Sequence, residues 1–239
     1  MLQEKLELLQ KKYAVGCDAV ISEDAKSVRI GGVSYPLLSH RYERRFTELR
    51  RMLHDGTVSG VSAIRCGNVS TGEKTLGELI LRELDICRFL SGHEIVSVTN
   101  FTAGDRAADL IAVLDNGVVC SVEVAVTLPV GAETIDKHEV ISARGLVCDR
   151  VVDTQIPQNS IYLYADENVA YTDVDFELYG LNAGEVAAVR AAFALAKSVE
   201  LCEEALLELK TLERLSVCAA KSAATGKKIS VKEASEWNV

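Results

Sequence analysis

Three ionisable side chains near the middle of the chain have the spacing of a single row on a helix: Glu78, Arg82 and Asp85. Their steps of four and three residues make them neighbours on a helical surface. A carboxylate beside a guanidinium either forms a fixed ion pair or binds an anion or a hydroxyl-bearing ligand. Surface pairs are worth only about 0.3–0.5 kcal/mol each, so a solvated helix face and a pocket wall are both open interpretations.

The helix that would carry this row is predicted over segment 75–92. Apolar residues recur there at steps of three and four, which places them on one stripe of a helix opposite the polar row. Gly92 stands where a C-terminal glycine cap is expected. The stripe consists of Leu76, Leu79, Ile80, Leu84, Cys87 and Leu90.

The rest of the chain runs from helix to strands, to helix, to many strands and back to helices. Asp115-Asn116-Gly117 is a strong hairpin signal, because Asn-Gly supplies the positive φ angles of a type I′ turn. This order predicts an α+β fold: an open, mostly antiparallel β-sheet of about six or more strands flanked by helices, after a short N-terminal helix and β-hairpin region. Helices are expected at 2–13, 43–54, 183–197 and 200–225, and strands at 19–21, 27–30, 33–35, 58–70, 94–101, 108–114, 118–128, 137–142, 146–152 and 160–164.

The strand at 118–128 has a two-residue alternation that separates a core face from a second, small and mildly polar face. Glu123 lies on that second face as a carboxylate expected to be buried, and such a face is often covered by another subunit or a ligand. His138 is expected on the surface, at the beginning of the strand 137–142. The core-face residues are Val118, Cys120, Val122, Val124 and Val126.

Charge and hydropathy exclude two classes of partner. The net charge is −9, and the basic cluster at 40–51 is interrupted by Glu43 and Glu48, so nucleic-acid binding is not expected. No apolar run approaches the roughly 20 residues of a membrane span. Segment 1–13 is a charged amphipathic helix and not a signal peptide.

The cysteines and histidines indicate neither disulfides nor a metal site. The seven cysteines are odd in number, scattered and without a CxxC pair, which is typical of reduced core residues in a cytoplasmic protein. The four histidines lie far apart without ligand spacing, so no metal is expected. The chain also lacks a Walker loop, GxGxxG and GxSxG.

Several segments, taken in order, resemble a known family. They are His40-Arg41-Tyr42 before a helix, the turn 55–60, the segment 79–92 ending in Phe89-Leu90-Ser91-Gly92, the strand pair within 108–124 around Asn116-Gly117, and the close at 222–227. The set resembles the C-terminal, substrate-side domain of the Gfo/Idh/MocA oxidoreductases, the family of glucose–fructose oxidoreductase and inositol dehydrogenase. The resemblance implies an open sheet that forms a pocket floor and an oligomer interface, beside a Rossmann domain that holds NAD(P).

The chain departs from that family before the matched region. We expect residues 1–38 to form an N-terminal helix and short strands, 39–231 the family-like domain and 232–239 a C-terminal extension. Residues 1–38 contain no strand, glycine loop and helix that could hold a pyrophosphate, and the family's Glu-Lys-Pro motif is missing. No cofactor is therefore expected, and NAD(P) only if a separate Rossmann domain supplies it.

A second departure concerns the family's active-site "D-x-x-x-H" pair, whose positions match Glu78 and Arg82. A histidine accepts and returns a proton near neutral pH, whereas an arginine does not. Glu78 is a poor base as well, because a guanidinium four residues away lowers the pKa of a carboxylate. The pair therefore indicates a fixed ion pair, or a binder of anions or hydroxyls, and no residue is assigned a catalytic role.

Three functions follow from this combination. The first is a truncated, non-catalytic or accessory oxidoreductase-like subunit that oligomerises through its sheet face or joins a full-length family dehydrogenase. The second is a binding module for a sugar or sugar acid. The third is the substrate domain of an NAD(P)-dependent sugar or polyol dehydrogenase whose Rossmann domain is supplied elsewhere. The predicted ligand-binding residues are Arg41, Tyr42, Glu78, Arg82 and Asp85.

Overall fold

The computed structural model spans all 239 residues and describes the chain except for residues 150–159, 165–168, 173–176 and 235–239. It divides into two compact units: residues 1–47 with 174–211, and residues 48–173 with 212–239. The boundaries expected from the sequence at residues 38 and 231 remain predictions. Among the described residues, no helix combines the length and the apolar character needed to cross a membrane.

The first unit is built around a short antiparallel sheet and its covering helices. Gly31 and Gly32 form the turn between two of its strands, both with positive φ (57° and 85°) that only glycine adopts without strain. Its core includes Leu6, Val28 and Leu195, all buried. The predicted N-terminal helix and hairpin are confirmed. The elements are α1 (Leu2–Lys12), β1 (Ala19–Ile21), β2 (Ser27–Ile30), β3 (Val33–Pro36), the 3₁₀-helix η1 (Ser39–Tyr42) and α4 (Ala183–Lys197).

The second unit contains the large sheet. Among the described residues its strands follow the order β11-β10-β9-β8-β4-β7-β6-β5-β12, and every neighbouring pair is antiparallel except β4 with β7. The expected open, mostly antiparallel sheet is thus confirmed. Its strands are β4 (Val61–Thr71), β5 (Ile95–Ala103), β6 (Ala107–Leu114), β7 (Val119–Leu128), β8 (Ile135–Ser142), β9 (Gly145–Cys148), β10 (Ser160–Tyr164), β11 (Val169–Thr172) and β12 (Ile229–Ser230).

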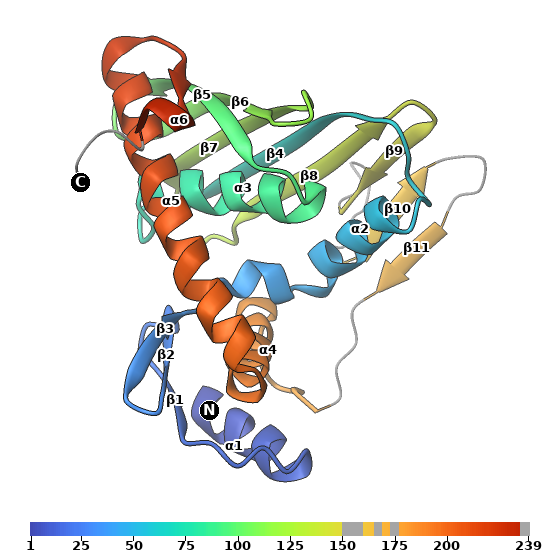
Figure 1. Ribbon diagram of the computed structural model, residues 1–239, viewed down its shortest axis with the longest axis vertical. Coiled ribbons are helices and arrows are strands. Elements are labelled where there is room, and N and C mark those ends of the chain that lie inside the picture. The colour runs from blue at the N-terminus through green and yellow to red at the C-terminus, as the bar shows by residue number, and fades with distance from the viewer. Residues whose placement is uncertain (150–159, 165–168, 173–176, 235–239) are drawn as a thin grey trace. The chain divides into compact units, whose positions relative to one another are not determined.

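Helix α3 (Leu76–Ser91) lies against one face of this sheet, over β4, β6 and β7 (Figure 1). The carboxyl-terminal part of α5 (Val199–Thr225) is bonded to β5, since the Asn100 amide N–H donates to Ser222 Oγ at 2.8 Å and its Nδ2 donates to the Ala219 carbonyl at 3.1 Å. The remaining helices are α2 (Arg44–His54) and α6 (Val231–Ala234). Both α2 and α5 contribute residues to each unit.

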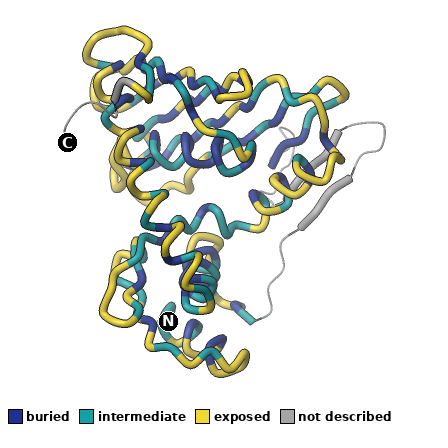
Figure 2. The backbone as a smooth tube through the Cα atoms, in the orientation of Figure 1, coloured by how far each residue is buried: buried dark blue, intermediate teal, exposed yellow. Residues whose placement is uncertain are grey.

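The two faces of the sheet differ in burial, as the alternating colours along its strands show (Figure 2). In β7 the expected core-face residues Cys120, Val122 and Val124 are buried, whereas Val119 and Glu123 are exposed. The expected alternation is confirmed. The burial expected of Glu123 is wrong for the single chain, because this side chain lies on the face opposite α3.

Candidate functional site

Helix α3 is capped at both ends; the glycine cap expected at Gly92 is confirmed, and the N-terminal cap is seen only in the structure. Thr75 is the N-cap: its Oγ1 accepts the Glu78 amide N–H at 3.2 Å, and Glu78 Oε2 accepts the Thr75 amide N–H at 2.8 Å. This reciprocal capping box satisfies two amide donors that the first turn leaves free. Gly92 closes the helix with φ of 70°. Glu78 therefore has a structural task at the beginning of the helix.

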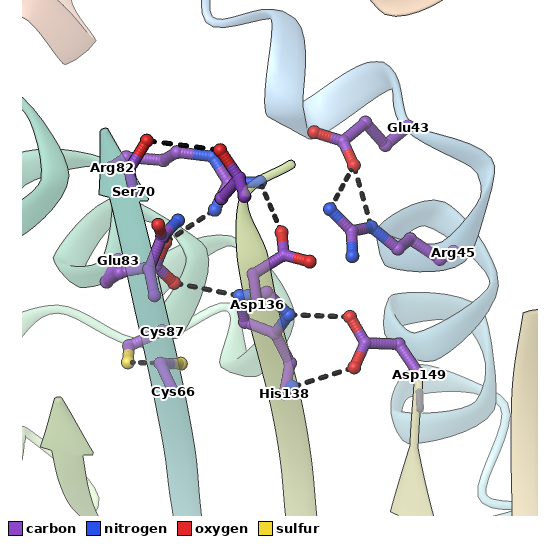
Figure 3. Close-up of polar contacts among 12 residues, drawn as sticks. Glu43, Arg45, Cys66, Ser70, Arg82, Glu83, Cys87, Asp136, His138 and Asp149 are labelled. Carbon is purple, nitrogen blue, oxygen red and sulfur yellow. Dashed lines mark hydrogen bonds and ion pairs between the residues drawn. The ribbon is translucent and has the colours of Figure 1, made fainter. Parts of the chain in front are cut away.

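The other two members of the predicted polar row bind different partners. The Arg82 guanidinium donates to Glu83 Oε1 at 2.5 Å and to Asp136 Oδ2 at 3.4 Å (Figure 3). Asp85 is fully buried and accepts from Arg88 Nη1 at 3.1 Å. Their spacing places Glu78, Arg82 and Asp85 on one side of α3, but each of them forms its hydrogen bonds with different residues.

A buried triad next to Arg82 combines one imidazole with two carboxylates. His138 Nε2 lies 2.8 Å from Glu83 Oε2, and His138 Nδ1 lies 2.6 Å from Asp149 Oδ2 (Figure 3). The backbone N–H of His138 also donates to Asp149 Oδ1 at 2.7 Å. The side chains of all three residues are inaccessible or nearly so. Because both ring nitrogens face carboxylate oxygens, the ring is an imidazolium in this arrangement.

The charges of this cluster outweigh the cost of burial. Burial alone would raise the pKa of Glu83, but the charges of Arg82 and His138 and the hydrogen bonds from His138 and Asn68 lower it from 4.5 to about 2. Burial alone would lower the pKa of His138, but the charges of Asp149 and Glu83 and the bonds to both raise it well above its ordinary value. A fully buried triad has no contact with a substrate in solution, so its chemistry is that of an internal clamp or an ion site.

Two further polar groups border the triad. Asn68 Nδ2 donates to Glu83 Oε1 at 2.9 Å, while its Oδ1 is buried and has no hydrogen-bond partner among the described residues. Cys66 Sγ lies 3.6 Å from Cys87 Sγ, and both thiols are buried. One potential ligand atom each from Cys66, Glu83 and His138 lies within 4.8 Å of the other two.

The strand register assembles this cluster. Cys66 of β4 is directly opposite His138 of β8, and Asn68 follows Cys66 on the same face two residues along. Sequence reasoning placed His138 on the surface, and this is wrong, because β8 begins at Ile135 and His138 lies inside it, fully buried. The available signal was its two-residue spacing from Val140, which shares the inner face.

The remaining predicted site residues, Arg41 and Tyr42, lie in η1 of the first unit. Arg41 Nη2 pairs with Glu208 Oε2 at 2.9 Å, and burial is the main cause that raises the pKa of Tyr42. Both line a hollow of about 50 Å³ in that unit. Pockets for small molecules usually measure about 300–1,000 Å³, so this hollow by itself is too small for a sugar.

A larger hollow, of about 590 Å³, lies on the face of the large sheet opposite α3, which is called the open face below. Its floor is one cross-strand row whose register is Lys137, Gly67, Glu123, Asp109 and Phe101, from β8 through β4, β7 and β6 to β5. Glycine in the middle of this row leaves the floor open. The two carboxylates are directly opposite each other and both residues are exposed, which places like charges side by side.

No known family model matches this sequence, and no curated protein matches it. Solved structures do match in fold, and they are oxidoreductases of the Gfo/Idh/MocA type. An oxidoreductase from Agrobacterium radiobacter, solved in complex with NAD+, L-tartaric acid and magnesium, is 16% identical with a TM-score of 0.64, covering 82% of this chain and 64% of that one.

Two further neighbours support the same fold. A levoglucosan dehydrogenase, solved with NADH and levoglucosan, is 16% identical with a TM-score of 0.60, covering 81% of this chain and 65% of that one. A myo-inositol dehydrogenase-like protein of Sinorhizobium meliloti is 20% identical with a TM-score of 0.54, covering 81% and 64%. At these identities the likeness is one of fold, and the chain spans less than two thirds of the length of these three neighbours.

Proposed function

We propose that this chain is an oxidoreductase-like subunit that associates through the open face of its sheet and does not carry out dehydrogenation by itself. The observation that supports this most is the state of Arg82. It occupies the helix position at which the resembling family carries its histidine, and it is bound to Glu83 and Asp136. In this proposal the chain corresponds to the C-terminal, substrate-side part of such an oxidoreductase.

The chemistry follows from the proton that dehydrogenation must remove. Oxidation of an alcohol carbon needs a base near the hydroxyl group, with a pKa near the working pH. A guanidinium stays protonated and cannot be that base. Glu78, one turn before Arg82, is engaged in the capping box, where its carboxylate accepts from both the Thr75 amide and the Thr75 hydroxyl. Arg82 therefore offers no acceptor for that proton, and Glu78 already accepts two hydrogen bonds at Oε2.

The association surface is the open face of the large sheet. Large apolar side chains are exposed there: Phe101 (58%), Ile111 (39%), Val119 (40%) and Ile135 (48%). Exposed apolar groups gathered on one sheet face are typical of an interaction site. A cation of a second copy placed over Asp109 and Glu123 would compensate their like charges.

The catalytic half of this proposal is tested by titrating the purified chain with NADH and NADPH and following nucleotide fluorescence. No saturable change is expected, nor any NAD+ reduction with inositol, levoglucosan or tartrate. A saturable signal with turnover would contradict the proposal and favour an active enzyme. Turnover that needs an added nucleotide-binding chain would favour the substrate domain of a split dehydrogenase.

The association half is tested by light scattering after gel filtration. The wild-type chain is expected to be a dimer or larger, and Ile111→Lys is expected to be monomeric, because a buried ammonium ion at the contact is costly. Leu209→Lys is the matched control, since Leu209 is equally exposed (38%) but lies in the first unit. A monomeric wild-type chain, or equal behaviour of both variants, would overturn the open-face interface.

A second candidate function is the binding of a sugar acid by Arg82. Its side chain is 19% exposed, and a structural neighbour was solved with L-tartaric acid. Calorimetric titration with tartrate and gluconate separates this function from the first: Arg82→Ala would abolish binding, whereas Arg106→Ala, an exposed arginine of the β5–β6 turn, would not. Absence of binding by the wild-type chain would exclude it for these ligands.

A further inference from the structure

The buried cluster at β4, α3 and β8 has the composition of a metal centre. Cys66, Glu83 and His138 offer a thiol sulfur, a carboxylate oxygen and an imidazole nitrogen, and these atoms lie within 4.8 Å of one another. The first and the last of these residues are 72 positions apart, and the three do not have the spacing of a metal-binding motif in the sequence. We propose that these three residues form a closed binding site for a zinc ion.

The imidazole and the carboxylate need only a small adjustment to bind one ion, and the Cys66 sulfur lies within 4.8 Å of both ligand atoms. His138 Nε2 and Glu83 Oε2 are 2.8 Å apart. Zn–N and Zn–O bonds of about 2.0–2.2 Å in a tetrahedral site put these two ligand atoms roughly 3.3 Å apart, so they separate by about 0.5 Å on binding. Cys66 is directly opposite His138 in the strand register, which keeps its sulfur beside the imidazole.

The groups behind the ligands have the arrangement that metal sites use. Zinc-bound histidines commonly donate their other ring N–H to a carboxylate, which fixes the tautomer and the ring orientation. Asp149 Oδ2, at 2.6 Å from His138 Nδ1, is in that place, and its Oδ1 accepts the backbone N–H of the same residue. His138 is therefore oriented with Nε2 towards Glu83 and Cys66.

Asn68 supplies a second, independent observation. Its Nδ2 donates to Glu83 at 2.9 Å, and its Oδ1 is buried without a partner in the part of the chain that the structure describes. Rotating the amide would not help, because it would set an oxygen against the Glu83 carboxylate. A buried carbonyl-type oxygen without a donor costs stability, and a cation bound in the adjoining cluster would offset this cost electrostatically.

Charge balance also permits the ion. On binding, Cys66 loses its thiol proton and His138 loses the proton on Nε2, while Glu83 is already ionised. One divalent cation then replaces two protons, and the net charge of the buried cluster does not change. Mixed sulfur and nitrogen ligands select zinc over magnesium or calcium, which bind oxygen. Because the ligands are inaccessible, the ion would hold three elements together and would not activate water.

The test begins with the wild-type chain. It is unfolded in guanidinium with a chelator and a thiol reductant, and then refolded by dilution with either zinc chloride or magnesium chloride. Native mass spectrometry is expected to show one tightly held zinc per chain and no magnesium. The zinc form is expected to unfold at a higher urea concentration than the metal-free form, because an ion that binds only the folded state stabilises it.

Variants then locate the ion. With cobalt as a spectroscopic substitute, the wild-type chain is expected to show a thiolate-to-cobalt absorption band that Cys66→Ser loses and Cys202→Ser, a buried cysteine of the first unit, retains. Asp149→Asn should lower zinc affinity about 10–100-fold, because it removes the carboxylate behind His138. The fold of each variant is checked without metal by circular dichroism.

The proposal fails if the refolded wild-type chain holds no zinc, or if Cys66→Ser retains both the ion and the absorption band. It does not depend on the proposed function, since neither readout involves nucleotide binding or self-association.

Discussion

Charged residues have different surroundings on the two faces of the large sheet. Beneath α3, Glu83, His138 and Asp149 are buried and joined by bonds of 2.6–2.8 Å, so each charge meets an opposite one. On the open face Asp109 and Glu123 are neighbours of the same sign and both are exposed. Water reduces the repulsion between the exposed pair, whereas the two carboxylates of the buried triad are compensated by His138 and by Arg82.

This difference separates what holds the chain together from what is available to a partner. The inner cluster joins β4, β8 and α3 and contributes to folding, and the open face retains apolar area and unbalanced charge for another molecule. Substitutions on the two faces are therefore expected to change the free energy of unfolding by different amounts. Changes in the buried cluster are expected to cost several kcal/mol, and changes on the open face a few tenths.

The largest effect is expected for His138→Ala. The substitution leaves Glu83 and Asp149 buried without the cation between them, which costs about 3–5 kcal/mol in the free energy of unfolding. Urea denaturation of the metal-free chain at pH 7 measures it, because the imidazolium is present only without zinc. Lys137→Ala, one residue earlier and 39% exposed on the other face, is the control and should change stability by less than about 0.5 kcal/mol. Equal losses of stability in His138→Ala and Lys137→Ala would contradict the difference between the two faces.

Glu83→Gln is expected to cost about 3 kcal/mol at pH 7, with a definite pH dependence. The pKa of Glu83 is lowered from 4.5 to about 2 on folding, so its ionised form stabilises the folded state above pH 4.5. That contribution is lost as the pH falls from 4.5 towards 2. The stability difference between wild type and variant should therefore narrow over this range in urea titrations. A difference independent of pH would contradict the ionic role of Glu83.

His138 contributes to stability with the opposite pH dependence to that of Glu83. Its pKa is raised on folding, so its stabilising effect is complete below its unfolded value and is lost as the pH rises through the raised value. Wild-type stability is therefore expected to decline at alkaline pH by more than that of His138→Ala. Hydrogen exchange of the β8 amides, measured across this range, should follow the same trend, and a parallel decline of both proteins would argue against a buried imidazolium.

Thr75→Ala tests the helix that covers the inner face. Loss of the N-cap hydroxyl leaves the Glu78 amide unsatisfied and should cost about 1 kcal/mol, within the usual range for such caps. Thermal unfolding measures the change. Thr102→Ala, an exposed threonine near the end of β5, is the control and should be close to neutral. A neutral Thr75→Ala would mean that α3 is held by its packing alone.

The smallest effect is expected for Asp109→Asn. Removing one charge of the open-face pair should stabilise the monomer by about 0.5 kcal/mol at low ionic strength, and added salt should erase the gain. The measurement uses a protein concentration below that of self-association. Destabilisation at every salt concentration would show that Asp109 already has a favourable partner within the chain.

Much of the fold could be predicted because it depends on local patterns. The period of segment 75–92 and Gly92 at its close predict α3 with its C-terminal cap, and the alternation along 118–128 predicts the two faces of β7. The polar row on α3 was predicted by spacing alone, but its partners were not. Asp85 is bound by Arg88, and Arg82 by Glu83 and Asp136.

The sequence by itself determined the helix at 75–92, its glycine cap and the α+β sheet beneath it, whereas the match of Arg82 to a family histidine stays a prediction. Only the tertiary structure decided that Cys66, Glu83, His138 and Asp149 meet. Helix and strand periods are local, because they depend on residues two to four positions apart. The meeting of β4, α3 and β8 depends on strand register and on which side of the sheet the helix packs, and these are set by the whole core.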